Sequence, residues 1–153
     1  MSLLSTRDIS KCIKERYPGN FLAVFPLNHL PDGIIRHFPY AMIVNMDINN
    51  LPGKHWLAIY GTHTHVEVFD PLAMELPGYL KRWILRRYGS RWSTNQMAYQ
   101  HVLSDLCGAY CIWYLLERYK TGHMDQVLIG LFPGAPNFND SLISQYFKYY
   151  CKM

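Results

Sequence analysis

The chain lacks an apolar run long enough to cross a membrane, and its opening segment, MSLLSTRDISKCIKERY, brings in charged residues too early for a secretory signal peptide. It also lacks internal repeats, low-complexity segments and linker-like stretches. At 153 residues it is long enough to bury one core. These features predict a single intracellular domain over residues 1–153, without membrane association.

Charge and cysteine are both scarce. Only 17% of the residues are charged and half are hydrophobic, which is typical of a folded domain rather than a disordered chain. In a reducing compartment the four cysteines are expected to be thiols rather than a disulfide framework: Cys12, Cys107, Cys111 and Cys151. The THTH turn, with His63 and His65, has no Cys or His pair nearby at zinc-site spacing, so no metal site is expected.

Hydrophobic spacing predicts strands and helices without regular alternation. Strands are expected in NFLAVF, in PYAMIVNM, on either side of the GTHTH turn and over residues 92–99. Helices are expected over residues 6–16, 75–88 and 105–119 and in the tail FNDSLISQYFKYYCKM. This pattern indicates an α+β domain with a central, mostly antiparallel sheet flanked by helices.

The stretch SDLCGAYCIWYLLERY places Cys107 where a helix begins. The unpaired N–H groups and the positive dipole end of a helix N-terminus favour a thiolate. Lowering a thiol pKa from about 8.5 to about 5 takes roughly 5 kcal/mol, and the helix terminus supplies at most about 2 kcal/mol. A nucleophile here therefore needs a neighbouring imidazolium. Taken alone, Cys107 is explained equally well as a packed core residue. Cys111, one turn later, is interpreted as a packed residue, because redox pairs usually have Cys-x-x-Cys spacing.

Three other residues would complete such a site. His55 opens one strand and Asp70 ends the next, so an antiparallel pairing would place them at the same sheet edge. Asp70 could accept the second ring N–H of His55 and stabilise its imidazolium form. Gln100, seven residues before Cys107, has a side-chain amide that could join the Cys107 backbone N–H in binding an oxyanion. Each residue alone has a structural explanation, but the four together indicate a catalytic thiol site.

A basic cluster lies in the window LKRWILRRYGSR. It holds five of the fifteen basic residues, interleaved with aromatic residues: Lys81, Arg82, Arg86, Arg87 and Arg91. Such a mixture can bind a nucleic-acid backbone. It is also typical of the solvated face of a surface helix, and the sequence leaves both explanations open.

The motifs GKHWLAIY, VEVFDPLA, and a Gln followed seven residues later by CGAYC resemble the adenovirus protease (adenain) family, including related proteases of adenovirus-like and Polinton-type DNA elements. FLAVF and AMIVN also look like early strands of that family, so the resemblance covers most of the chain. It implies the adenain and SUMO-protease-like fold, with the nucleophile at a helix N-terminus. Matched by motif, Cys107 is the nucleophile, His55 the base and acid, Asp70 the orienting acid and Gln100 an oxyanion donor.

The resemblance implies a cysteine endopeptidase that cleaves viral structural and core precursors at Gly-containing sites during virion maturation, in the virion and host nucleus. Its chemistry needs no cofactor. Family members are activated by a viral peptide and by DNA; the basic cluster fits DNA, whereas Gly89 replaces the cysteine to which the peptide is attached. Because deconjugating proteases of ubiquitin-like modifiers also use Asp at the position of Asp70, deconjugation is an alternative. A DNA-binding packaging module with an inactive site is a second.

Overall fold

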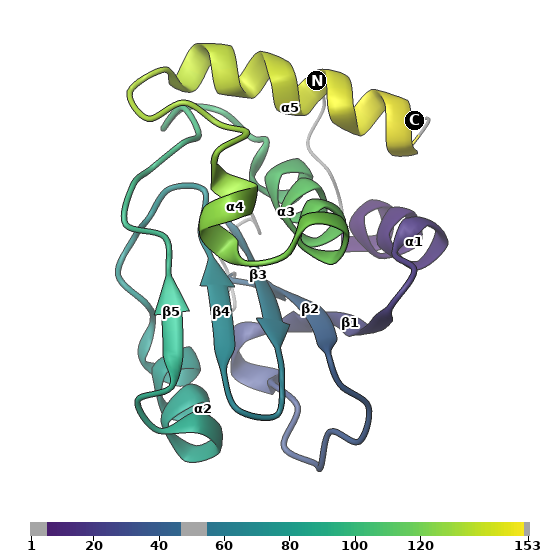
Figure 1. The fold of residues 1–153 in the computed structure, drawn as a ribbon, viewed down its shortest axis with the longest axis vertical. Helices are drawn as coiled ribbons and strands as arrows, with labels where there is room; N and C mark the ends of the chain where they lie inside the picture. Colours follow the sequence, from purple (N-terminus) through teal and green to yellow (C-terminus); the bar gives the residue numbers. More distant parts are fainter. Residues whose placement is uncertain (1–5, 47–54, 152–153) are drawn as a thin grey trace.

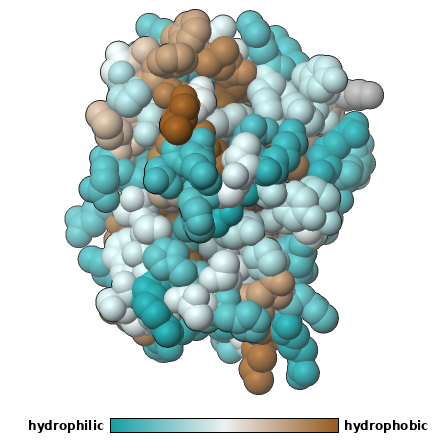
Figure 2. Space-filling view, in the orientation of Figure 1, coloured by the Kyte–Doolittle hydropathy of each residue, from teal (hydrophilic) through white to brown (hydrophobic). Residues whose placement is uncertain are grey.

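The computed structural model describes residues 6–46 and 55–151, which form a five-stranded sheet with helices on both faces (Figure 1). The strands lie side by side in sequence order: β1 (Asn20–Pro26), β2 (Tyr40–Asn45), β3 (Trp56–Gly61), β4 (Val66–Phe69) and β5 (Trp92–Thr94). The predicted α+β class is confirmed. The surface on the viewed side is largely hydrophilic, with apolar side chains gathered mainly near the end where α5 lies (Figure 2).

The sheet is mixed. β2, β3 and β4 pair antiparallel, whereas β1 pairs with β2 and β5 with β4 in parallel. The prediction of a mostly antiparallel sheet is therefore wrong at both edges. The reason is that each edge strand is joined to its neighbour by a crossover: a 3-10 turn (Leu27–His29) with its following loop after β1, and a helix before β5.

Four helices cover one face of the sheet: α1 (Thr6–Arg16), α3 (Cys107–Thr121), α4 (Met124–Leu128) and α5 (Pro136–Cys151). The fifth, α2 (Gly78–Tyr88), covers the opposite face. Because both faces are covered, every residue of β3 is buried, as are those of β2 except the last. Among the described residues, no helix combines the length and apolarity needed to cross a membrane.

Several elements differ from the predictions. The helix predicted from residue 75 begins at Gly78, because Pro77 is extended and occupies the N-cap position. The strand predicted over residues 92–99 ends at Thr94. The short helix α4 was not predicted from the sequence.

A buried ion pair fixes α3 to the sheet. Arg118 on α3 donates from Nε and Nη2 to the two carboxylate oxygens of Glu67 on β4, at 2.8 and 2.9 Å. The Tyr114 hydroxyl donates to the same carboxylate at 2.7 Å, and the Arg118 guanidinium lies 4.1 Å from the ring centroid of Tyr60. These contacts set the direction of the helix whose first residue is Cys107.

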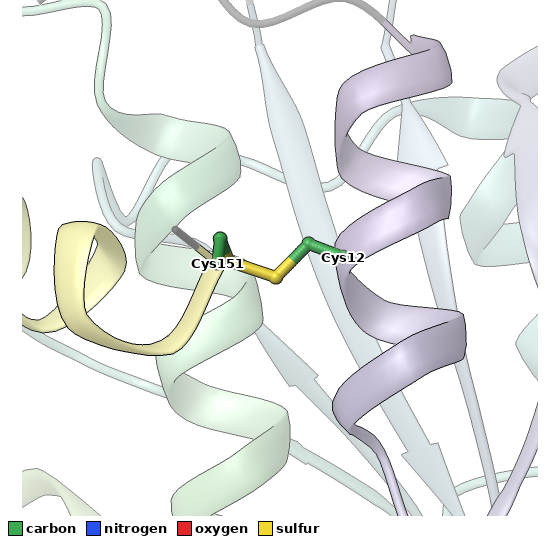
Figure 3. Close-up of a disulfide and its surroundings, with 2 residues drawn as sticks. All are labelled: Cys12 and Cys151. Carbon is green, nitrogen blue, oxygen red and sulfur yellow. A yellow bond between two sulfur atoms is a disulfide. The ribbon is translucent and has the colours of Figure 1, made fainter. Parts of the chain in front are cut away.

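Cys12 and Cys151 form a disulfide, so the prediction of four thiols is wrong for these two (Figure 3). They lie 139 positions apart in sequence, but α1 and α5 pack on the same face of the sheet and bring their Cα atoms to 5.3 Å. Cys107 and Cys111 are not in a disulfide, and both are buried on α3. The pairing depends on helix packing, which the cysteine spacing does not reveal.

Reducing this disulfide is expected to lower the free energy of unfolding by about 2–4 kcal/mol, because the bond restricts the unfolded chain over a long loop. Urea unfolding with and without dithiothreitol measures the difference. The Cys12→Ser variant should unfold at the same lower urea concentration in both conditions. An equal stability of the oxidised and reduced chains would contradict this expectation.

Candidate active site

His55 and Asp70 lie together at one edge of the sheet. His55 directly precedes β3 and Asp70 directly follows β4, and the antiparallel pairing of these strands brings their ends together. His55 Nε2 lies 2.9 Å from Asp70 Oδ1, although it is not aligned as a hydrogen bond. The predicted proximity is thus confirmed. Apo sites often hold such contacts in loose alignment that tightens when substrate binds.

The Asp70 carboxylate is buried and held in place by the loop that follows it. Its Oδ1 accepts the backbone N–H of Leu72, and its Oδ2 accepts that of Met74, each at 2.9 Å. Its backbone is held by Asn95, whose carboxamide bonds to both the N–H and the C=O of Asp70. The carboxylate therefore has a fixed direction, with Oδ1 beside the imidazole of His55.

Cys107 is the first residue of α3 and is 1% exposed. Burial raises the pKa of its thiol to about 12, partly opposed by hydrogen bonds from the backbone N–H groups of Trp56, Gly108 and Cys107 itself. The nearby charge of Asp70 adds to the increase. The contact with the Trp56 N–H places the sulfur beside the start of β3, where His55 lies.

Desolvation therefore outweighs the helix N-terminus, and the pKa of the Cys107 thiol is raised rather than lowered. The resting thiol is neutral. His55 Nδ1 is buried and has no hydrogen-bond partner among residues 6–46 and 55–151. An imidazole nitrogen with this freedom can take the thiol proton during the reaction, as a general base.

Gln100 reaches the site through its backbone, which donates to the carbonyl of Pro71, one residue after Asp70, at 3.1 Å. Its side chain is turned toward Ser104: Nε2 donates to the Ser104 carbonyl at 2.9 Å and to its hydroxyl oxygen at 3.1 Å. Its Oε1 is buried without a partner in the described part of the chain. To bind an oxyanion, the carboxamide must turn its N–H groups from Ser104 toward the substrate.

The basic cluster lies on and just after α2, on the face of the sheet opposite α3. Arg87 donates to the backbone carbonyls of Pro31 and Gly33 and lies over the ring of Trp83, so it has a structural role. The other members are exposed: Lys81, Arg82, Arg86 and Arg91. Within the described residues, no group of three or more His, Cys, Asp or Glu side chains is arranged to hold a metal.

Two residues of the site were not found from the sequence. Asn95 fell inside a predicted strand, and Ser104 fell in the segment before the helix. Asn95 acts through hydrogen bonds to Asp70, which is distant in sequence. Ser104 acts by accepting hydrogen bonds from one rotamer of the Gln100 side chain. Neither has a spacing pattern that would mark it.

The five-stranded sheet and the helices that cover it have the SUMO-protease-like fold, as comparison with solved structures shows. The chain is similar to the ASFV pS273R protease in two crystal structures. The selenomethionine form superposes with a TM-score of 0.67 at 15% identity, over 98% of this chain and 68% of that chain. The other gives 0.65 at 15% identity, over 98% and 67%. No family model and no curated protein matches the sequence.

Proposed function

We propose that this chain is a cysteine endopeptidase. The observation that carries the proposal is the meeting of three elements at one point: His55 before β3, Asp70 after β4 and Cys107 at the start of α3. The likeness to the ASFV pS273R protease supports it, because the same fold serves a protease there. The motif resemblance to the adenovirus protease family points to the same chemistry.

The four residues divide the reaction between them. The Cys107 sulfur attacks the peptide carbonyl while His55 takes the thiol proton, and the resulting oxyanion is bound by the Cys107 backbone N–H and the Gln100 amide. His55 then protonates the leaving amine, which leaves an acyl thioester on Cys107. His55 next removes a proton from water, which attacks the thioester and releases the acid and the thiol. Asp70 stabilises the imidazolium form of His55 throughout.

The proposed substrates are precursor polypeptides of viral structural and core proteins, cut at Gly-containing sites in the virion and host nucleus. The motif resemblance supports this class. In this proposal an extended polypeptide contacts the turn between Gln100 and Cys107, which leaves Val102 76% and Leu103 86% exposed. Deconjugation of ubiquitin-like modifiers is the alternative that Asp70 favours, and cleavage of an isopeptide-linked rather than a linear substrate would identify it.

We also propose that duplex DNA stimulates the enzyme through the exposed members of the basic cluster. Their charges lie on a face away from Cys107, so bound DNA would not block the site. An activating peptide, if one exists, would have to bind without a disulfide at Gly89. A DNA affinity that does not fall as salt concentration rises would contradict the DNA proposal.

The test is hydrolysis of a fluorogenic peptide amide ending in Gly-Gly. The chain should release the fluorophore, with or without added duplex DNA, and the Cys107→Ala variant should not. Cys111→Ala is the matched control, because Cys111 is an equally buried thiol one turn further along α3 and should be dispensable. Fluorophore release that survives in Cys107→Ala, or no release by the wild-type chain with DNA present, would overturn the proposal.

A further inference from the structure

The parallel ladder between β4 and β5 ends just before the site. Its last paired residues are Val68 and Thr94, and the two strands are no longer paired after them. The next residue on the β5 side, Asn95, is 5% exposed and bonds to Asp70 with both ends of its carboxamide. Its Oδ1 accepts the Asp70 N–H at 2.8 Å, and its Nδ2 donates to the Asp70 carbonyl at 2.7 Å and to that of Met97 at 3.0 Å.

A carboxamide presents one donor and one acceptor in the geometry of a backbone peptide group. Asn95 therefore extends the ladder by one step with its side chain, where the backbone of β5 has already turned away. Both peptide planes that flank Asp70 are held by it. This leaves the φ and ψ angles of Asp70 little freedom, and these angles set where the carboxylate points.

The carboxylate itself is held from its other side by the backbone N–H groups of Leu72 and Met74. Asp70 is thus fixed at its backbone by Asn95 and at its carboxylate by these two N–H groups. The Ala73 N–H also donates to the Asp70 carbonyl, at 3.0 Å. The imidazole of His55 meets the remaining open side of Oδ1. A change in the Asp70 backbone would move the carboxylate relative to His55 without removing either residue.

We propose that Asn95 is a positioning residue for the Asp70–His55 pair, an inference that rests on the proposed function. A residue that only satisfied buried backbone groups would affect stability alone. A positioning residue affects the rate of the chemical step in the folded chain as well. Displacing a catalytic group by about 1 Å can cost about 10²-fold in rate.

Two variants and one control test the inference with the Gly-Gly fluorogenic peptide. Asn95→Ala removes all three hydrogen bonds, and Asn95→Asp keeps the acceptor but places an oxygen against the Asp70 carbonyl. The control is Asn139→Ala. Asn139 is also fully buried and makes three hydrogen bonds through its carboxamide, to the backbones of Phe132 and Tyr99 and none to Asp70.

We expect both Asn95 variants to lower kcat about 10- to 100-fold with KM nearly unchanged, under conditions where urea unfolding shows them to be folded. Asn139→Ala should lose comparable stability and keep kcat within about threefold of wild type. Wild-type kcat in a folded Asn95→Ala chain, an equal loss of kcat in Asn139→Ala, or unfolding of both Asn95 variants would overturn the inference. An inactive wild-type chain would instead overturn the proposed function, and this inference with it.

Discussion

Replacing Cys107 by alanine is expected to lower kcat for peptide hydrolysis by at least about 10⁴-fold. In the proposed mechanism the Cys107 sulfur forms the acyl intermediate, and an alanine side chain has no group that can do so. The substitution removes only the sulfur from this buried position, so the fold should stay intact, which urea unfolding would check. The matched Cys111→Ala variant should keep kcat within about threefold of wild type, since Cys111 is packed one turn away.

The His55→Ala variant should lose about as much activity as Cys107→Ala, because the neutral thiol depends on His55 to remove its proton. The double variant should lose no more than either single variant, since the two residues act as one unit. Gln100→Ala should lose less, about 10²–10³-fold in kcat, because one oxyanion donor remains. Additive losses in the double variant would show that Cys107 and His55 do not act together.

Replacing Arg118 by methionine is expected to lower the free energy of unfolding by about 3–5 kcal/mol. The substitution leaves the Glu67 carboxylate buried without its paired guanidinium, and the Tyr114 hydroxyl is then its one hydrogen-bond donor among the described residues. It also removes the contact of the guanidinium with the Tyr60 ring. Urea unfolding of the purified variant measures the loss.

The matched control lies on the same helix. Lys120 pairs with Glu117 at 3.3 Å, but the lysine side chain is 48% exposed, so Lys120→Met should cost less than about 1 kcal/mol. The double variant Glu67→Gln/Arg118→Met should recover part of the loss, because no unpaired charge then remains buried. Equal losses for Arg118→Met and Lys120→Met would contradict a special role for the buried pair.

The proximity of His55 and Asp70 could be predicted because it follows from local chain geometry. Two strands joined by a short turn pair antiparallel, so the residue before the first and the residue after the second must be neighbours. The position of Cys107 could be predicted for a similar reason, because a polar segment gives way to helical spacing at that point. Local patterns thus placed three site residues at the ends of secondary-structure elements.

The remaining features depend on packing between distant segments. Cys12 meets Cys151 only because α1 and α5 lie on the same face of the sheet. The raised pKa of the Cys107 thiol results from its burial. The sequence predicts that Cys107 lies at a helix N-terminus, but it does not predict how deeply that end of the helix is buried. The hydrogen bonds between Asn95 and Asp70 depend on where β5 ends, at Thr94. The strand predicted from the sequence continued to residue 99 and so included Asn95.

The disulfide described above closes most of the chain into a covalent ring, with Cys12 and Cys151 at the junction. One backbone cut inside a ring opens it but releases nothing, and two cuts are needed to free a fragment. For the proposed cysteine endopeptidase, this has a practical consequence when the protein is stored at high concentration. A self-nicked molecule would keep the apparent mass of an intact one on a non-reducing gel, and only reduction would separate its pieces.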